Sequence, residues 1–133
     1  MATNETDNPK QRRVLIIDDE PHLLYAVAEH FRTLNYEVHS ASETEEAEAL
    51  LANFSYCLVI TDLALTRVGF RGLEILDHAW DLGERPKIIV LTGHCIPELQ
   101  VEAVTRGIDV FLHKPVRLRR LSQVAEQLLG ASA

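Results

Sequence analysis

Several features that mark specialised proteins are scarce in this sequence. There are only two cysteines, Cys57 and Cys95, and their separation of 38 positions matches neither a disulfide framework nor a zinc-ligand spacing. We therefore expect two free thiols in a reducing compartment. No apolar run approaches the roughly 20 residues needed to cross a bilayer. The composition thus excludes a disulfide-rich secreted protein and a transmembrane protein.

Basic residues are also in the minority. The chain has 13 lysines and arginines against 20 aspartates and glutamates, which gives a formal net charge of −7. An acidic surface disfavours nucleic acid or an anionic membrane as the main partner. The first ten residues are polar and lack the apolar segment of a signal peptide. We therefore expect a flexible tail over residues 1–11, a cytoplasmic location, and no direct binding to DNA or membrane.

What remains is ordinary globular composition. The 133 residues are 47% hydrophobic and 25% charged, which suits a single folded domain. No linker, repeat or low-complexity stretch divides the chain after the tail. We therefore expect one domain over residues 12–130, with no output domain following it.

Short β-branched runs alternate with helical patterns along this domain. The five runs are Val14–Ile17, Tyr36–Ser40, Cys57–Thr61, Lys87–Leu91 and Asp109–Leu112. Four are apolar almost throughout, as in strands buried on both faces. Tyr36–Ser40 instead alternates polar and apolar residues, which indicates an edge strand.

Each run is followed by apolar residues at helical spacing. The five stripes are Leu24, Val27, Ala28 and Phe31; Ala47, Leu50 and Leu51; Leu73, Leu76, Ala79 and Trp80; Leu99, Ala103 and Val104; and Leu121, Val124, Ala125 and Leu128. Ser42 and Glu45 have the spacing of a capping box, and Gly107 should end the fourth helix. Five strand–helix repeats predict an α/β fold with a parallel sheet between two helical layers.

Polar residues follow four of the predicted strands. Asp18 and Asp19 come after the first strand, Asp62 after the third, Thr92 after the fourth and Lys114 after the fifth. The carboxyl ends of parallel strands share one edge of the sheet, and ligands bind there. We therefore expect these five side chains to gather at one site.

The expected site has the chemistry of a phosphoryl-accepting metal centre. Carboxylates about 4 Å apart repel by roughly 4 kcal/mol per pair at an effective dielectric near 20, so they raise their pKa values or bind a cation. Hard oxygen donors favour Mg²⁺ or Mn²⁺. Asp62 ends the central apolar run, which makes it the candidate nucleophile for an aspartyl phosphate. Lys114 and Thr92 would then contact the phosphoryl group.

Four motifs, in this order, resemble the receiver domain of response regulators from two-component signal transduction. They are Val14–Pro21 (VLIIDDEP), Leu58–Leu63 (LVITDL), Ile89–His94 (IVLTGH) and Phe111–Pro115 (FLHKP). The resemblance extends over residues 12–129. It implies a flavodoxin-like, doubly wound (βα)5 fold in three layers with strand order 2-1-3-4-5. It also implies a signalling domain, not a turnover enzyme.

The resemblance also implies roles for particular residues. Asp62 would accept a phosphoryl group from a sensor histidine kinase or a histidine phosphotransfer protein. Mg²⁺ would be held by Asp18, Asp19, Asp62 and the backbone carbonyl of Ala64, with Lys114 and Thr92 on the phosphoryl oxygens.

Further implied roles concern the response to phosphorylation. Thr92 and Phe111 would form a switch that changes the face made by the fourth helix, fifth strand and fifth helix. Ala64 and His94 would tune dephosphorylation. One departure from the family pattern lies after Asp62, where Thr66 replaces a usual proline and the loop is longer and more basic.

Other interpretations of the same residues stay open. A phosphatase of the haloacid-dehalogenase type needs an acid two positions after the nucleophile, where this chain has Ala64. A flavin or nucleotide binder needs a Gly/Ser/Thr-rich loop after the first strand, where Asp18–Pro21 would repel phosphate. A phosphorylation-independent interaction module, or a receiver cut from a longer regulator, would keep the same fold.

Arg117, Arg119 and Arg120 cluster at the start of the last predicted helix. Such a cluster suits a solvated helix face. It also suits half of a charged interface, with an acidic partner or with a second copy in a phosphorylation-dependent homodimer. Positive charge at a helix N-terminus opposes the macrodipole, which favours the interface interpretation.

Overall fold

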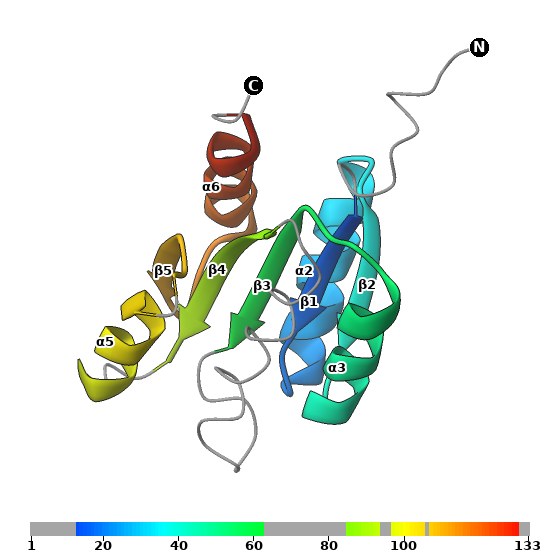
Figure 1. Cartoon of the computed structure of the whole chain (residues 1–133). Helices are drawn as coiled ribbons and strands as arrows, with labels where there is room; N and C mark the ends of the chain where they lie inside the picture. Colours follow the sequence, from blue (N-terminus) through cyan, green and yellow to red (C-terminus); the bar gives the residue numbers. More distant parts are fainter. Residues whose placement is uncertain (1–12, 63–84, 94–96, 106, 131–133) are drawn as a thin grey trace.

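The computed structural model describes residues 13–62, 85–93, 97–105 and 107–130. Five parallel strands form one sheet in the order β2-β1-β3-β4-β5, and helices pack on both sides of it (Figure 1). The strands are β1 (Arg13–Ile17), β2 (Glu37–Ala41), β3 (Leu58–Asp62), β4 (Lys87–Thr92) and β5 (Val110–His113). The helices are α2 (Pro21–Thr33), α3 (Thr44–Asn53), α5 (Pro97–Thr105) and α6 (Leu118–Gly130).

The strand order and the strand positions confirm the sequence-based predictions. Each predicted strand lies within one residue of the observed one. β1 lies between β2 and β3, and Val14 is in register with both Val38 and Leu58. The alternating run Tyr36–Ser40 does form an edge strand, β2. The chain therefore has the expected doubly wound sheet, with all strand carboxyl ends on one edge.

Alternate residues of each strand supply two separate hydrophobic cores. On one face Leu15, Ile17 and Val59 pack with Ala47 and Leu51 of α3. On the other face Val14, Ile16, Leu58 and Ile60 pack with α2 and α6, which contribute Val27, Ala28, Phe31, Leu121, Val124 and Ala125. Because the sheet is covered on both sides, β1, β3 and β4 are buried along almost their whole length.

Local sequence signals explain where α2 begins and where α5 ends. Pro21 occupies the first turn of α2, and the Glu20 carboxylate accepts a hydrogen bond of 2.7 Å from the Leu23 amide. Gly107 follows α5 with a φ of 90°, and its amide donates to the Val104 carbonyl at 2.9 Å. Only glycine adopts that conformation without strain, which confirms the predicted role of Gly107.

The predicted capping box at Ser42 and Glu45 is wrong by one residue. α3 begins at Thr44, and the Glu46 carboxylate accepts a hydrogen bond of 3.1 Å from the Ser42 amide. Glu45 and Glu46 are adjacent, so the sequence alone does not distinguish which of them contacts Ser42. In the structure it is Glu46, because the helix begins at Thr44. The side-chain half of the box is missing, because Glu43 occupies the N-cap position without a side-chain cap.

Two burial predictions are also corrected. The fifth run was expected to be buried on both faces, but the residues of β5 are half-buried or exposed; its place at the edge of the sheet agrees with the predicted strand order. Val104 was expected on the apolar stripe of α5, but it is 61% exposed. The predicted helical stripe from Leu73 to Trp80 lies outside the described residues. None of the helices in the described part of the chain combines the length and apolar character needed to cross a bilayer.

Candidate functional site

Asp18, Asp62 and Lys114 meet at the carboxyl edge of the sheet. Asp18 comes directly after β1, Asp62 is the last residue of β3, and Lys114 comes directly after β5. The Asp18 amide donates to the Ala41 carbonyl at 3.1 Å, so the β1–β2 pairing continues up to the site. The sheet itself thus positions groups that are far apart in the sequence.

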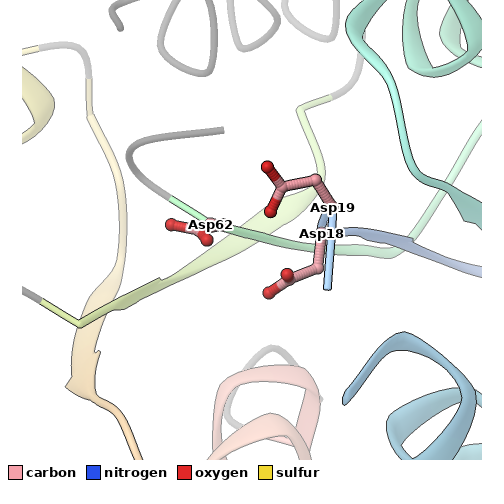
Figure 2. Close-up of side chains that lie close together, drawn as sticks. All are labelled: Asp18, Asp19 and Asp62. Carbon is pink, nitrogen blue, oxygen red and sulfur yellow. The ribbon is translucent and has the colours of Figure 1, made fainter. Parts of the chain in front are cut away.

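Three carboxylates lie together there, as predicted. One oxygen from each of Asp18, Asp19 and Asp62 lies within 4.8 Å of the others, and Figure 2 shows the three side chains gathered at the ends of β1 and β3. Asp18 is buried, Asp62 is half-buried and Asp19 is exposed. All three donors are hard carboxylate oxygens, a set that fits Mg²⁺ or Mn²⁺.

Lys114 bridges two of these carboxylates. Its Nζ donates to Asp18 Oδ2 at 2.9 Å and to Asp62 Oδ2 at 3.0 Å. The other Asp18 oxygen, Oδ1, accepts a hydrogen bond of 2.9 Å from the Glu20 amide. Asp18 is therefore held at both oxygens, and the lysine offsets part of the repulsion between Asp18 and Asp62.

The pKa values of this pair follow from burial and charge. Burial raises the pKa of Asp18, and the hydrogen bonds from the Glu20 amide and from Lys114 only partly oppose that rise. Burial acts to lower the pKa of Lys114, but the hydrogen bonds to Asp18 and Asp62 outweigh it and the pKa is raised. Lys114 therefore stays protonated, whereas burial disfavours the ionised form of the neighbouring Asp18 carboxylate.

Thr92 lies on β4 and Phe111 on β5, the two strands that follow β3 in the sheet. Thr92 is buried at the end of β4, and its carbonyl accepts a hydrogen bond of 2.8 Å from the Lys114 amide. The Lys114–Pro115 peptide bond that follows is cis. Phe111 is half-buried, packs against the α3-side core, and lines a cavity of about 500 Å³ with Val101, Val104 and Thr105. Thr92 thus lies beside Lys114, whereas Phe111 lies next to the cavity that α5 also lines; their role as a switch stays a prediction.

Other expectations differ in their outcome. Ala64, His94, Thr66 and Cys95 lie outside the described residues, so their roles stay predictions. Arg117, Arg119 and Arg120 are exposed. Sequence reasoning did not foresee the double bridge made by Lys114. It also did not foresee that Glu20, counted with the acidic residues, caps α2; its place directly before Pro21 was the available signal.

Comparison with known proteins supports one family. Residues 14–126 match the model of the response regulator receiver domain. The alginate biosynthesis transcriptional regulatory protein AlgB of Pseudomonas aeruginosa is 30% identical over 125 residues, which cover 94% of this chain and 27% of that protein. NtrX of Azorhizobium caulinodans, a nitrogen assimilation regulatory protein, is 30% identical, over 87% of this chain and 26% of its own length. The chain thus spans about a quarter of these two relatives.

Solved structures agree with this match. A CheY-like receiver domain protein from Methanospirillum hungatei superposes with a TM-score of 0.83 at 29% identity, covering 90% of this chain and 94% of that one. A response regulator from Burkholderia pseudomallei, solved with a phosphorylated aspartic acid, a calcium ion and citrate, has a TM-score of 0.78 at 26% identity, covering 91% and 70%. With its sheet order and its acidic cluster, the chain belongs to the family of response regulator receiver domains of two-component systems.

Proposed function

We propose that this domain accepts a phosphoryl group on Asp62 from a phosphohistidine of a sensor kinase or a histidine phosphotransfer protein. The observation that carries the proposal is the placement of Asp62 at the end of β3, beside two further carboxylates and one ammonium group. A carboxylate oxygen of Asp62 would attack phosphorus while the bond from phosphorus to the histidine nitrogen breaks. The nitrogen then takes up a proton, and Asp62 becomes an acyl phosphate.

Asp18, Asp19 and Asp62 would hold the divalent cation, with the Ala64 carbonyl as the fourth protein ligand. Bound Mg²⁺ supplies charge neutralisation for the transferred phosphoryl oxygens. The Burkholderia pseudomallei relative, which carries both a phosphorylated aspartic acid and a calcium ion, supports this pairing of metal and acceptor. Few protein ligands leave positions open for water and for a phosphoryl oxygen.

Lys114 has a second part in the proposal. In the described structure its ammonium group contacts the Asp62 carboxylate. Once Asp62 carries a phosphoryl group, the same ammonium would contact a phosphoryl oxygen, and Thr92 would donate its hydroxyl hydrogen to another. Because the Thr92 carbonyl already accepts from the Lys114 amide, a movement of either residue would act on both β4 and β5.

The output would be a change at the α5–β5–α6 face. Phe111 lies on β5 beside a cavity that α5 also lines, so its ring has space into which it can move when Thr92 shifts. Ala64 and His94 are proposed to set the lifetime of the acyl phosphate, and Ala64→Asn or Ala64→Glu should change that lifetime. The downstream partner that binds this face would be a protein. The exposed arginines at the start of α6 would contribute to that contact or to a homodimer.

Phosphotransfer from histidine kinases tests the proposed donor. Purified kinases of the source organism would be autophosphorylated with labelled ATP and mixed with the wild type, with Asp62→Asn and with an exposed-site control, Glu126→Gln. The proposal predicts rapid transfer from at least one kinase to the wild type and to Glu126→Gln, and none to Asp62→Asn. Transfer that survives Asp62→Asn, or the absence of transfer from every kinase, would contradict it.

A further inference from the structure

A groove lies between β2 and α3, at the edge of the sheet remote from β5. Its volume is about 690 Å³, and its lining residues are His39, Ser40, Glu46, Ala49, Leu50, Asn53 and Phe54. Phe54 is 38% exposed, which is high for a phenylalanine. The groove therefore combines the apolar side chains of Ala49, Leu50 and Phe54 with the polar side chains of His39, Ser40, Glu46 and Asn53.

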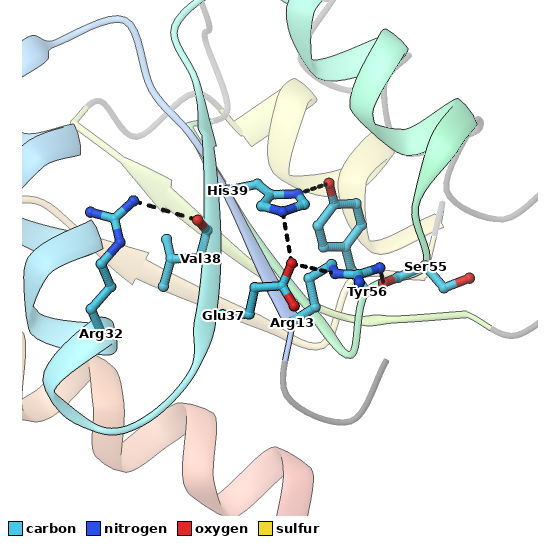
Figure 3. A network of polar contacts seen from close by, with 7 residues as sticks. All are labelled: Arg13, Arg32, Glu37, Val38, His39, Ser55 and Tyr56. Carbon is cyan, nitrogen blue, oxygen red and sulfur yellow. Dashed lines mark hydrogen bonds and ion pairs between the residues drawn. The ribbon is translucent and has the colours of Figure 1, made fainter. Parts of the chain in front are cut away.

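One wall of the groove is held in place by a polar network. His39 contacts the Tyr56 hydroxyl through Nδ1 at 2.7 Å and the Glu37 carboxylate through Nε2 at 3.1 Å. Glu37 is also bound by Arg13 Nε at 3.1 Å, as Figure 3 shows. Both ring nitrogens of His39 are engaged, so the ring has a fixed orientation on the groove wall.

The aromatic rings on this side form one contiguous cluster. The Phe54 ring meets the His39 ring edge-on, with centroids 4.7 Å apart, and the Arg13 guanidinium lies 4.9 Å from the Phe54 centroid. Tyr56, which is buried, completes the cluster beneath them. A preformed apolar wall binds a partner at a lower entropic cost than a mobile one.

The rim of the groove is acidic on its α3 side, because Glu46 lines the groove and the preceding residue, Glu45, is exposed. Four glutamates, Glu43, Glu45, Glu46 and Glu48, occur between His39 and Cys57, and that stretch contains no lysine, arginine or histidine. Glu43, Glu45 and Glu46 are exposed. Arg13 is a neighbouring cation, which is paired with Glu37 and also lies over the Phe54 ring. This arrangement attracts cations and repels phosphate, which disfavours nucleic acid and anionic lipid as occupants.

We propose that this groove is a docking site for a basic amphipathic segment of a partner protein. An apolar side chain of the segment would lie on Phe54 and Leu50, while lysine or arginine side chains would pair with Glu45 and Glu46. The groove is separate from the acidic cluster around Asp62, because its lining residues belong to β2, to α3 and to Phe54 directly after α3. It would add a second contact surface that does not depend on the chemistry at Asp62.

The groove is tested with a synthetic helical peptide of leucine and lysine, with leucine at helical spacing, added to the ¹⁵N-labelled protein. Two further peptides serve as controls: one of the same composition in shuffled order, and one with glutamate in place of lysine. We expect saturable amide shifts at Ser40, Ala49, Leu50, Asn53 and Phe54 with the amphipathic basic peptide. The shuffled and acidic peptides should bind more weakly.

Matched variants separate the groove from general charge attraction. Glu45→Gln with Glu46→Gln removes two rim charges, and glutamine keeps an oxygen that can accept from the Ser42 amide. Its control, Glu98→Gln with Glu126→Gln, removes two exposed charges elsewhere. The rim variant should bind about threefold to tenfold more weakly, as expected for exposed ion pairs, and the control should bind as the wild type does.

Phe54→Ala tests the apolar half of the site, with Tyr25→Ala as the control for loss of an exposed aromatic ring. Phe54→Ala should weaken binding about tenfold, whereas Tyr25→Ala should not. If the spectrum of Phe54→Ala shows that this variant is not folded, the binding of the rim variant alone tests the proposal. Shifts that map to another surface, equal binding by the shuffled peptide, or equal loss in both charge variants would overturn the proposal. Self-association of the protein that the rim variant abolishes would also overturn it, because the occupant would then be a second copy.

Discussion

Lys114 and Asp62, which lie 52 positions apart in the sequence, are joined by a hydrogen bond of 3.0 Å between Nζ and Oδ2. The same ammonium group also contacts Asp18 at 2.9 Å. The lysine thus offsets the charge of two carboxylates that would otherwise repel each other across the site. Any cation that enters the cluster shares these carboxylates with Lys114, and so metal binding and the position of Lys114 are coupled.

Replacing Lys114 should destabilise the protein in a way that Mg²⁺ corrects. Lys114→Met leaves buried Asp18 and half-buried Asp62 without their ammonium partner, at a cost of about 2 kcal/mol in the free energy of unfolding. Mg²⁺ supplies the missing positive charge, so the loss should shrink as Mg²⁺ is added. Urea unfolding with and without Mg²⁺ measures this, with Lys114→Arg as the charge-conserving control. An equal loss at every Mg²⁺ concentration would contradict the coupling.

Removing a carboxylate of the acidic cluster should lower the affinity for Mg²⁺, whereas removing an acidic side chain elsewhere on the surface should not. Asp19→Asn removes one charge from the cluster, and the Coulomb attraction lost should lower Mg²⁺ affinity by about tenfold or more. Glu126→Gln, an exposed change on α6, should leave the affinity unchanged. Calorimetric titration of Mg²⁺ into the three proteins compares them. Equal affinities for the wild type and Asp19→Asn would remove Asp19 from the metal site.

Tyr56 should make stability fall at alkaline pH. Burial raises the pKa of Tyr56 above its ordinary value of 10.0, so the folded state keeps a proton that the unfolded chain loses above about pH 10. The stability contributed by this group is therefore fully present below that pH and is lost as the pH rises further, at up to about 1.4 kcal/mol per pH unit.

Tyr56→Phe removes that ionisation and also the hydrogen bond to His39. At neutral pH the variant should be about 1 kcal/mol less stable than the wild type. The difference should narrow across the alkaline range, because only the wild type loses stability through this group. Urea unfolding of both proteins over that range provides the comparison. A difference that stays constant with pH would show that Tyr56 ionises alike in both states.

Gly107 should tolerate no side chain without cost. Its φ of 90° disfavours every residue with a Cβ, and an added Cβ would lie 2.4 Å from Nη2 of Arg85, which donates to the Gly107 carbonyl. Gly107→Ala should reduce stability by about 1–2 kcal/mol, measured by thermal or urea unfolding. Gly130→Ala is the control, because a Cβ there meets no atom within 4 Å. Equal stability of the two variants would contradict the backbone argument.

Much of this fold could be predicted from local patterns. Apolar β-branched runs mark strands buried on both faces, and Val14–Ile17 and Lys87–Leu91 were placed within one residue for this reason. The run at Asp109–Leu112 looks the same, yet the residues of β5 are half-buried or exposed, and only the strand order implied by the family resemblance put this strand at the edge. Hydrophobicity along a strand does not state how many neighbours it has, so its half-exposed environment could not be read from its residues.

The site was predictable as a set of residues and unpredictable as a network. The strand-end rule brought Asp18, Asp62 and Lys114 to one edge, because that rule depends only on strand direction. The double contact of Lys114, and the contact between His39 and Tyr56, depend on side-chain geometry across separate strands. No spacing in the sequence carries that information.

Phosphorylation by a small-molecule donor tests the central claim most directly. The protein would be incubated with acetyl phosphate with Mg²⁺ or with a chelator, and its intact mass and peptide map would be recorded. We predict a gain of one phosphoryl group on Asp62 that requires Mg²⁺ and is absent from Asp62→Asn. A protein that gains no mass, that is modified at another residue, or that is modified equally without a divalent cation would contradict the account.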